Sequence, residues 1–408
     1  MDPVNEEKLK GMDMQEFAIG RRHVLAGLSG LAATATGARA QDLPLPSRPV
    51  ALNIMDVAGN LQLTQESITR FATQNPQLVS RVSFQRAPSP ELPSKLRAQQ
   101  AANRVDIDLV LTGPGAMSDG IGMGLWIDVW KRHPGQLPDA ASIYHEGALM
   151  MQRNFGRDQG VAVVYSPSGP IFEYAPARLR TVPKTAAELL AWAKANPNRM
   201  TYARPVNSGP GWTFLMGMPY ILGDRDPKDP VNGWDKTWAW LAELGQNIDH
   251  YPGGTAAMMK EFGDGNRDLI VSTCGWDINP RALGIVPKDA GVFVLEGTRW
   301  VPDTQFMAIP KGVPDDKVAV LLRLMSFLLQ PEQQAATYDR GYFYPGPAVR
   351  GATLAMAPAE SQAVIREFGR PEYDRLIAEL PFAEPLTPDR LILAFRRWDE
   401  QIGAKATR

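Results

Sequence analysis

Cysteine and histidine are both scarce in this sequence. Its 408 residues include one cysteine, Cys274, and four histidines. No disulfide can therefore form within one molecule, and neither a CxxC nor an HExxH zinc motif is present. Cys274 follows a short apolar run, which favours a buried structural thiol over a reactive nucleophile. We therefore expect no metal centre, no cofactor and no catalysis by cysteine.

Net charge and long apolar runs are lacking as well. The formal net charge is -1 at pH 7, which argues against nucleic acid or an anionic membrane surface as a partner. After the amino-terminal region, no run reaches the roughly 18 uninterrupted apolar residues of a membrane helix. Glycine clusters occur, yet none has the GxGxxG or GxxxxGK[ST] spacing of a nucleotide site. The length predicts about two domains.

The amino-terminal 40 residues have the three regions of a cleaved export signal. Arg21 and Arg22 precede a short, weakly apolar run, and Ala38 and Ala40 form an A-x-A cleavage site. The paired arginines resemble the twin-arginine signal of bacteria. The alternative is a basic helix start in an alanine-rich cytoplasmic segment. We expect a signal over residues 1–40 and a mature protein that is soluble in the periplasm.

The mature chain opens with alternating strands and helices. Residues 50–55, 81–86 and 106–111 are expected strands, separated by helices over 65–74 and 92–102. This alternation predicts a parallel sheet, and such sheets bind ligands at the carboxyl ends of their strands. That edge gathers Asp56, Ala58, Gly59, Thr112 and Gly113.

Residues 253–279 carry the densest set of pocket-forming residues. A short helix capped by the Thr255 hydroxyl is expected to end at glycines and lead into a buried strand, 268–272. That strand delivers Trp276 and Asp277 at its carboxyl end. A hydroxyl, a large aromatic and a carboxylate in one place predict a pocket wall rather than a reaction centre.

Three further segments contribute candidates. Ser208, Gly209 and Trp212 lead into an expected helix over residues 214–221, whose first amides suit a polar or anionic oxygen, although an ordinary loop explains these residues equally well. Asp303 lies in an expected strand. Glycine and proline flank the tyrosines of GYFYPGP, which favours exposed aromatics for binding over packed ones. Those tyrosines are Tyr342 and Tyr344.

In this order, the segments resemble an extracellular solute-binding protein, the capture subunit of a bacterial ABC importer, in its larger type II form. The resemblance runs from about residue 50 to residue 344. It rests on the first strand and its small-residue turn, the segment SKLRAQQAANRVDIDLVLTG, the glycine-punctuated stretch 253–277 and the helix LLRLMSFLLQPEQQ. It implies an α/β fold of two lobes, each a mostly parallel sheet flanked by helices, with hinge strands between them.

The resemblance also implies a division of the chain and a mode of action. After the signal, residues 41–164 form the first part of lobe one, 165–303 form lobe two, and 304–408 return to lobe one and add carboxyl-terminal helices. The chain crosses between lobes near Tyr165 and near 303–309. A monomer would hold its solute in the cleft and pass it to an inner-membrane permease.

Two solute classes fit the candidate residues equally well. Polyamine-binding relatives pair carboxylates with aromatics, which Asp56, Trp276, Asp277 and Asp303 match, so a polyamine or another organic cation is one expectation. Carbohydrate-binding relatives also stack aromatics, so a carbohydrate or polyol is the other. The adjacent tyrosines of iron-binding relatives are not matched, because Phe343 separates the two tyrosines here.

A secreted hydrolase is the alternative function. It needs a nucleophile, a base and an orienting acid. His133 and His145 lie in a loop-like region without a G-x-S-x-G elbow, and His250 has no acid partner in view in the sequence. We therefore expect binding without turnover.

Overall fold

The computed structural model describes residues 43–404, so the export signal predicted over residues 1–40 lies outside the described part of the chain. The strands are β1 Val50–Asp56, β2 Val79–Arg86, β3 Leu109–Thr112, β4 Gly160–Gly169, β5 Ile171–Tyr174, β6 Met200–Thr201, β7 Leu269–Ser272, β8 Gly291–Phe293, β9 Val301–Ala308 and β10 Gly346–Pro347. The α-helices are α1 Leu61–Gln74, α2 Leu92–Ala101, α3 Pro114–Gly122, α4 Val129–Arg132, α5 Ala140–Ile143, α6 Glu146–Met150, α7 Ala186–Ala195, α8 Gly209–Ile221, α9 Asp235–Gly245, α10 Thr255–Gly263, α11 Ile278–Ala282, α12 Asp315–Leu328, α13 Pro331–Gln334, α14 Ala359–Phe368, α15 Pro371–Glu379 and α16 Pro388–Gln401. None of the helices in this described range is long and apolar enough to cross a bilayer.

The strands form two sheets. A six-stranded sheet has the order β10-β4-β9-β3-β1-β2, and a four-stranded sheet has the order β6-β7-β5-β8. We call each sheet with the helices packed on it the first and the second lobe. As predicted, β1, β2 and β3 are parallel. The α/β fold of two lobes is therefore confirmed.

The expectation of mostly parallel sheets is wrong, because both sheets are mixed. In the first lobe β9 pairs antiparallel with β3 and with β4. In the second lobe only β6 and β7, of the described strands, pair in parallel. The physical reason is the route of the chain. The chain leaves the first lobe through β4 and returns to it through β9, so these two strands run in opposite directions.

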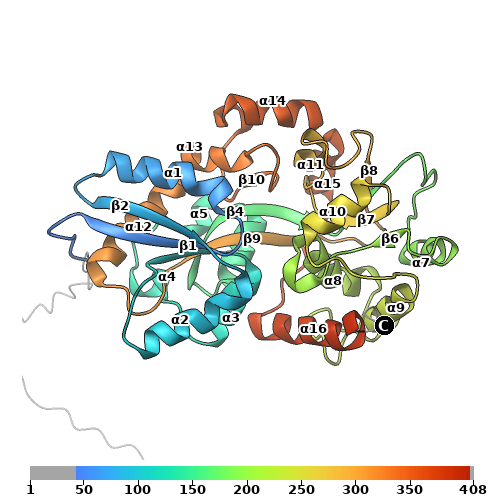
Figure 1. Cartoon of the computed structure of the whole chain (residues 1–408), viewed down its shortest axis with the longest axis horizontal. Helices are drawn as coiled ribbons and strands as arrows, with labels where there is room; N and C mark the ends of the chain where they lie inside the picture. Colours follow the sequence, from blue (N-terminus) through green and yellow to red (C-terminus); the bar gives the residue numbers. More distant parts are fainter. Residues whose placement is uncertain (1–42, 405–408) are drawn as a thin grey trace, which may run out of the picture. The chain divides into compact units, whose positions relative to one another are not determined.

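Strands β4 and β9 connect the two lobes. They pair antiparallel along their length, with Gly160 opposite Ala308 and Gly169 opposite Val301. After β4 the chain continues directly into β5 of the second sheet (Figure 1). These are the connecting strands expected near Tyr165 and near 303–309. The finer division into residues 41–164, 165–303 and 304–408 remains a prediction.

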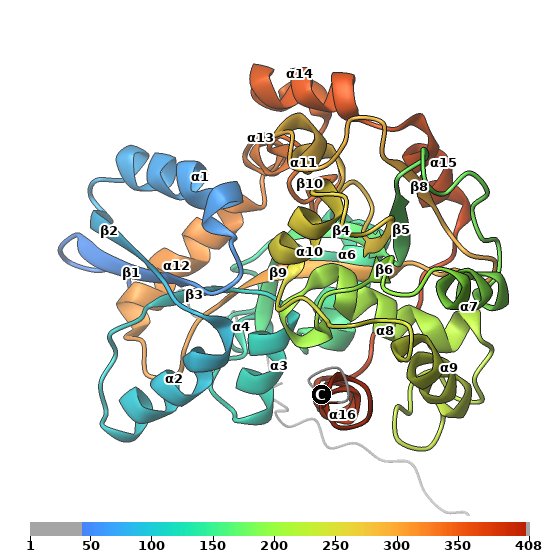
Figure 2. The same cartoon turned by 45° about the vertical axis from the view of Figure 1, so that its right-hand side comes forward.

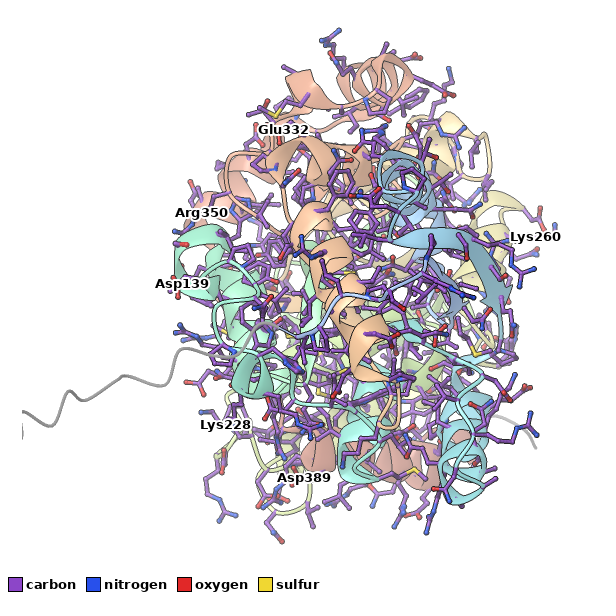
Figure 3. All side chains as sticks on the ribbon, turned by 90° about the vertical axis from the view of Figure 1, so that its left-hand side faces the viewer. Asp139, Lys228, Lys260, Glu332, Arg350 and Asp389 are labelled. Carbon is purple, nitrogen blue, oxygen red and sulfur yellow. The ribbon has the colours of Figure 1, made fainter. Side chains whose placement is uncertain are left out.

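Helices cover both sheets. In Figures 1 and 2, α1 lies on one side of β1 and β2, and α2 and α3 lie on the other. On the second lobe, α8 and α10 pack against β7. Charged side chains project outward, and Lys228, Lys260 and Asp389 lie at the periphery of the view in Figure 3. Formal charge is thus concentrated on the outside of the described part of the molecule.

The last helix, α16, contacts both lobes. It packs beside α3 of the first lobe, and an exposed ion pair joins Asp389 on it to Arg157 at 3.1 Å. Its buried Trp398 donates a hydrogen bond from Nε1 to the hydroxyl of Tyr202, beside β6 of the second lobe, at 3.0 Å. The chain therefore joins the lobes a third time after β4 and β9.

Candidate functional site

A cavity of about 750 Å³ lies between the two lobes. It is within the size range of pockets that hold small organic molecules. Residues after β1 and β3 form one wall, and the first turns of α8 and α10 with the segment after β7 form the other. Nine predicted site residues line it: Ala58, Gly113, Ser208, Gly209, Trp212, Thr255, Trp276, Asp303 and Tyr342.

Asp56, Gly59 and Thr112 do not line the cavity, although they lie at the predicted strand ends. The Asp56 carboxylate is buried and accepts hydrogen bonds from the backbone amides of Ala58, at 2.9 Å, and of Asn60 and Leu61, at 3.1 and 2.9 Å. It thereby fixes the turn before α1. Thr112 is fully buried, and Gly59 serves that turn with a φ of 73°. These residues shape the wall without facing the solute space.

Hydroxyl groups of the second lobe are paired with each other. The oxygens of Ser208 and Thr255 lie 2.8 Å apart, and Ser208 Oγ accepts from the amide of Gly211 at 3.2 Å, which caps α8. Thr255 was expected to cap its own helix. That prediction is wrong, because Gly254 occupies the N-cap position and the Thr255 hydroxyl contacts Ser208 instead.

Trp276 and Tyr342 meet across the cavity. Trp276 follows Gly275, whose φ of 73° suits only a residue without a side chain. The indole is half-buried, and its ring centroid lies 4.7 Å from that of Tyr342, which the first lobe carries, at an interplanar angle of 66°. The indole nitrogens of Trp276 and Trp212 have no hydrogen-bond partner. Aromatic side chains from both lobes therefore border the cavity, while the two unpaired indole nitrogens are buried.

Asp277 was expected to line the cavity together with Trp276. It does not line the cavity. It is fully buried and pairs with Arg281 and Arg370, each at 2.6 Å, while the Tyr373 hydroxyl donates to its other oxygen. These partners occupy the carboxylate completely. Tyr344 also lies outside the lining, packed against Tyr373 with ring centroids 6.2 Å apart. Neither residue is among those that line the cavity.

Asp303 is the acidic residue of the cavity wall. It is 7% exposed, and burial raises the pKa of its carboxyl to about 7 because the charged form loses hydration. Oδ1 accepts from the amide of Thr304 at 2.8 Å. Oδ2 lies beside Gly209, where a side-chain carbon would approach it to 3.1 Å. Among the residues that line the cavity, no arginine, lysine or histidine balances this carboxyl.

Several residues that line the cavity were not predicted from the sequence. Ser166 lies opposite Asp303 in the β4–β9 pair, and Gln305 follows Asp303 by two positions on the same face of β9. The two-residue period of a strand could have identified Gln305. Phe343 lies between the two predicted tyrosines. Phe395 comes from α16, and nothing local in the sequence connects it with the cavity.

His250 lies in a network of charged side chains outside the cavity. The expectation that His250 lacks an acid partner is wrong, because its ring lies 2.8 Å from Glu261 and 3.3 Å from Asp249. Its Nδ1 also contacts Arg267 at 3.1 Å, so the ring belongs to a surface ion-pair network. Within residues 43–404 no group of three His, Cys, Asp or Glu side chains is placed to hold a metal ion.

The sequence also matches a known protein family. Residues 66–363 match the family described as bacterial extracellular solute-binding protein. The chain belongs to this family. No curated protein matches its sequence.

Solved structures share the fold of this solute-binding protein at low sequence identity. The periplasmic binding protein AfuA from Actinobacillus pleuropneumoniae, with fructose-6-phosphate bound, is 16% identical, with a TM-score of 0.61 over 86% of this chain and 98% of that one. The spermidine/putrescine substrate-binding protein PotD from Streptococcus pneumoniae is 16% identical, with a TM-score of 0.55 over 85% and 99%. A periplasmic thiamin binding protein is 15% identical, with a TM-score of 0.58 over 90% and 99%. These likenesses concern the fold alone.

Proposed function

We propose that this protein is the periplasmic capture subunit of an ABC importer. It acts as a monomer, exported by the twin-arginine route, that holds a small organic solute between its lobes and delivers it to an inner-membrane permease. The observation that carries the proposal is the cavity of about 750 Å³, whose walls come from both lobes. A solute that touches both walls stabilises the closed arrangement, because it binds that arrangement better than an open one.

The lining of the cavity limits the class of solute. Without a basic side chain on the wall, a phosphate or carboxylate group would lose its hydration and gain no opposite charge. An anionic solute, such as the sugar phosphate of AfuA, is therefore disfavoured. The two expected classes, organic cations and carbohydrates, both remain compatible with aromatic walls and one carboxyl.

A hydrolase is disfavoured by the geometry of the same cavity. Its one thiol, Cys274, is buried, and burial raises the pKa of that thiol, so the reactive thiolate is suppressed. No histidine lines the wall to serve as a base. Capture without turnover accounts for the arrangement.

Native mass spectrometry of gently purified periplasmic protein tests the proposal. We expect a one-to-one complex with a small molecule, which dissociates on partial denaturation and then raises the thermal midpoint when it is added back. Recovery of a chemically altered molecule after incubation would instead establish an enzyme. Protein that carries no molecule, and whose midpoint no metabolite extract raises, would contradict solute capture.

A further inference from the structure

We propose that the solute is an organic monocation with an apolar or aromatic body, bound with its cationic group at Asp303 and its body toward the rim of the second lobe. This inference rests on the proposed function, because it names the solute of the same cavity. Four features of the wall support it.

The first feature is the isolation of one carboxyl. Asp303 is the only formally charged residue among those that line the cavity in the described structure. The elements around it bring Tyr165 and Ser166 from β4 and Gly209 from α8, none of which is charged near neutral pH. Burial also raises the pKa of the lining thiol and phenol, Cys274 and Tyr342, which therefore stay neutral. One cationic group finds a counter-charge here, whereas the further ammonium groups of a polyamine find none.

The second feature is the aromatic content of the wall. Trp212, Trp276, Tyr342, Phe343 and Phe395 all border the cavity. Aromatic faces attract cations, by roughly 1 to 2 kcal/mol when water is excluded, and they also stack on flat apolar bodies. Both parts of the proposed solute therefore find partners on the same wall.

The third feature is an apolar rim. Val206, Leu283 and Ile285 line the cavity and yet are 45%, 57% and 44% exposed, respectively. Large aliphatic side chains at the mouth of a pocket favour an apolar group that covers them. The solute therefore extends from the buried carboxyl toward an apolar end near the opening.

The fourth feature is that four polar side chains of the wall already have hydrogen-bond partners in the protein. Ser208 and Thr255 bond to each other, the Asn279 amide donates to the Arg340 carbonyl at 3.3 Å, and Gln62 donates to Asp339 at 2.8 Å. A carbohydrate needs several such groups to replace the water on its hydroxyls. Four polar side chains of the wall are thus already engaged, which reduces the number of partners that it offers to a carbohydrate.

Matched probes on the full-length mature protein test the inference. Benzyltrimethylammonium represents the proposed class, tetramethylammonium lacks the apolar body, spermidine represents polyamines and maltose represents carbohydrates. We expect calorimetry to give the lowest Kd for benzyltrimethylammonium, at least about tenfold below that of tetramethylammonium, because the ring adds apolar contact. Tighter binding of spermidine or maltose would overturn the inference and leave solute capture intact. Failure of all four probes, together with no co-purified molecule, would count against both.

Asp303→Asn keeps the shape of the side chain and removes its charge. We expect this variant to bind benzyltrimethylammonium at least about tenfold more weakly, since an ion pair in a dry site is lost. Asp106→Asn, at an exposed residue that does not line the cavity, controls for net charge and should bind as the wild type does. Unchanged affinity in Asp303→Asn would overturn the assignment of the cationic group.

The pH dependence of binding separates a direct contact from a structural role. The probe does not titrate, whereas the carboxyl, with its pKa of about 7, must lose its proton to pair with a cation. The Kd should therefore rise by up to about tenfold for each pH unit below 7 and level off above it. In Asp303→Asn the Kd should not vary with pH. A flat profile for the wild type would contradict the contact.

Discussion

Asp303 combines burial with the lack of an opposite charge, and this combination lowers the stability of the empty protein. An ordinary aspartate in an unfolded chain has a pKa of roughly 4, whereas burial raises the folded-state pKa to about 7. Between these values the folded state binds more protons than the unfolded state, so the contribution of this residue to stability falls as pH rises toward 7.

Asp303→Asn should therefore stabilise the solute-free protein at pH 8, on the order of 1 to 4 kcal/mol. Thermal midpoints of wild type and variant should converge as pH falls from 8 toward 4, because the wild-type carboxyl then becomes neutral as well. A variant less stable than the wild type at pH 8 would show that the charged carboxyl is stabilised inside the empty cavity.

Trp276→Ala distinguishes a cavity residue from a core residue. The indole is half-buried at the cavity wall, so we expect about a tenfold loss of affinity for benzyltrimethylammonium with a stability loss below about 2 kcal/mol. Trp240 is 8% exposed in the core, and Trp240→Ala should instead cost about 3 to 5 kcal/mol with affinity retained. A reversed pattern in calorimetry and melting would place Trp276 in the core.

For single residues, the sequence predicted where the carboxylates lie in the chain but not which of them face the cavity. Strand patterns placed Asp56, Asp277 and Asp303 at sheet edges or crossings, and all three are there. Whether such a carboxylate faces a cavity depends on its partners. The Asp56 carboxylate accepts hydrogen bonds from backbone amides at most five residues away. The partners of Asp277 include Arg370 and Tyr373, which follow it by 93 and 96 residues. No local pattern contains the second kind of information.

Among the elements, α15 fixes the wall that carries Trp276. Arg370 and Tyr373, at its start, bind Asp277 in the segment after β7. Asp277→Ala removes the carboxylate partner of the buried Arg281 and the partly buried Arg370, so we expect a loss of about 3 to 5 kcal/mol in unfolding free energy by denaturant titration. Glu372 meets the same Arg370 at 3.7 Å but is exposed, so Glu372→Gln should cost less than about 1 kcal/mol. Equal effects would mean that α15 does not anchor the wall.

Local signals predicted elements better than they predicted sheets. A T-x-x-E sequence, the pattern of a helix-capping box, stands at the start of α7, and the Glu188 amide donates to Thr185 Oγ1 at 3.1 Å. A cap is decided within four residues, so sequence suffices. Strand direction in β4 and β9 depends on where the chain goes between them, more than 130 residues of it, and alternation of apolar residues is the same in either direction.

For the whole molecule, we expect a hinge motion at β4 and β9. These paired strands join the lobes, so we expect a small change in their backbone angles to change the width of the cavity. Small-angle scattering should give a smaller radius of gyration when benzyltrimethylammonium saturates the protein, and Asp303→Asn at the same concentration should remain near the solute-free value. An identical profile with and without bound solute would indicate a rigid site.

Phe395 of α16 is part of the cavity wall, so the complete wall forms only when α16 is in place. All ten described strands are complete once residue 347 has been synthesised, so both lobes can form before α16 exists. A protease that cuts before residue 388 would leave every described strand in the chain but remove Phe395 from the cavity wall and the Trp398 anchor from the second lobe. We expect the shortened product to be less stable and to hold its cargo more weakly.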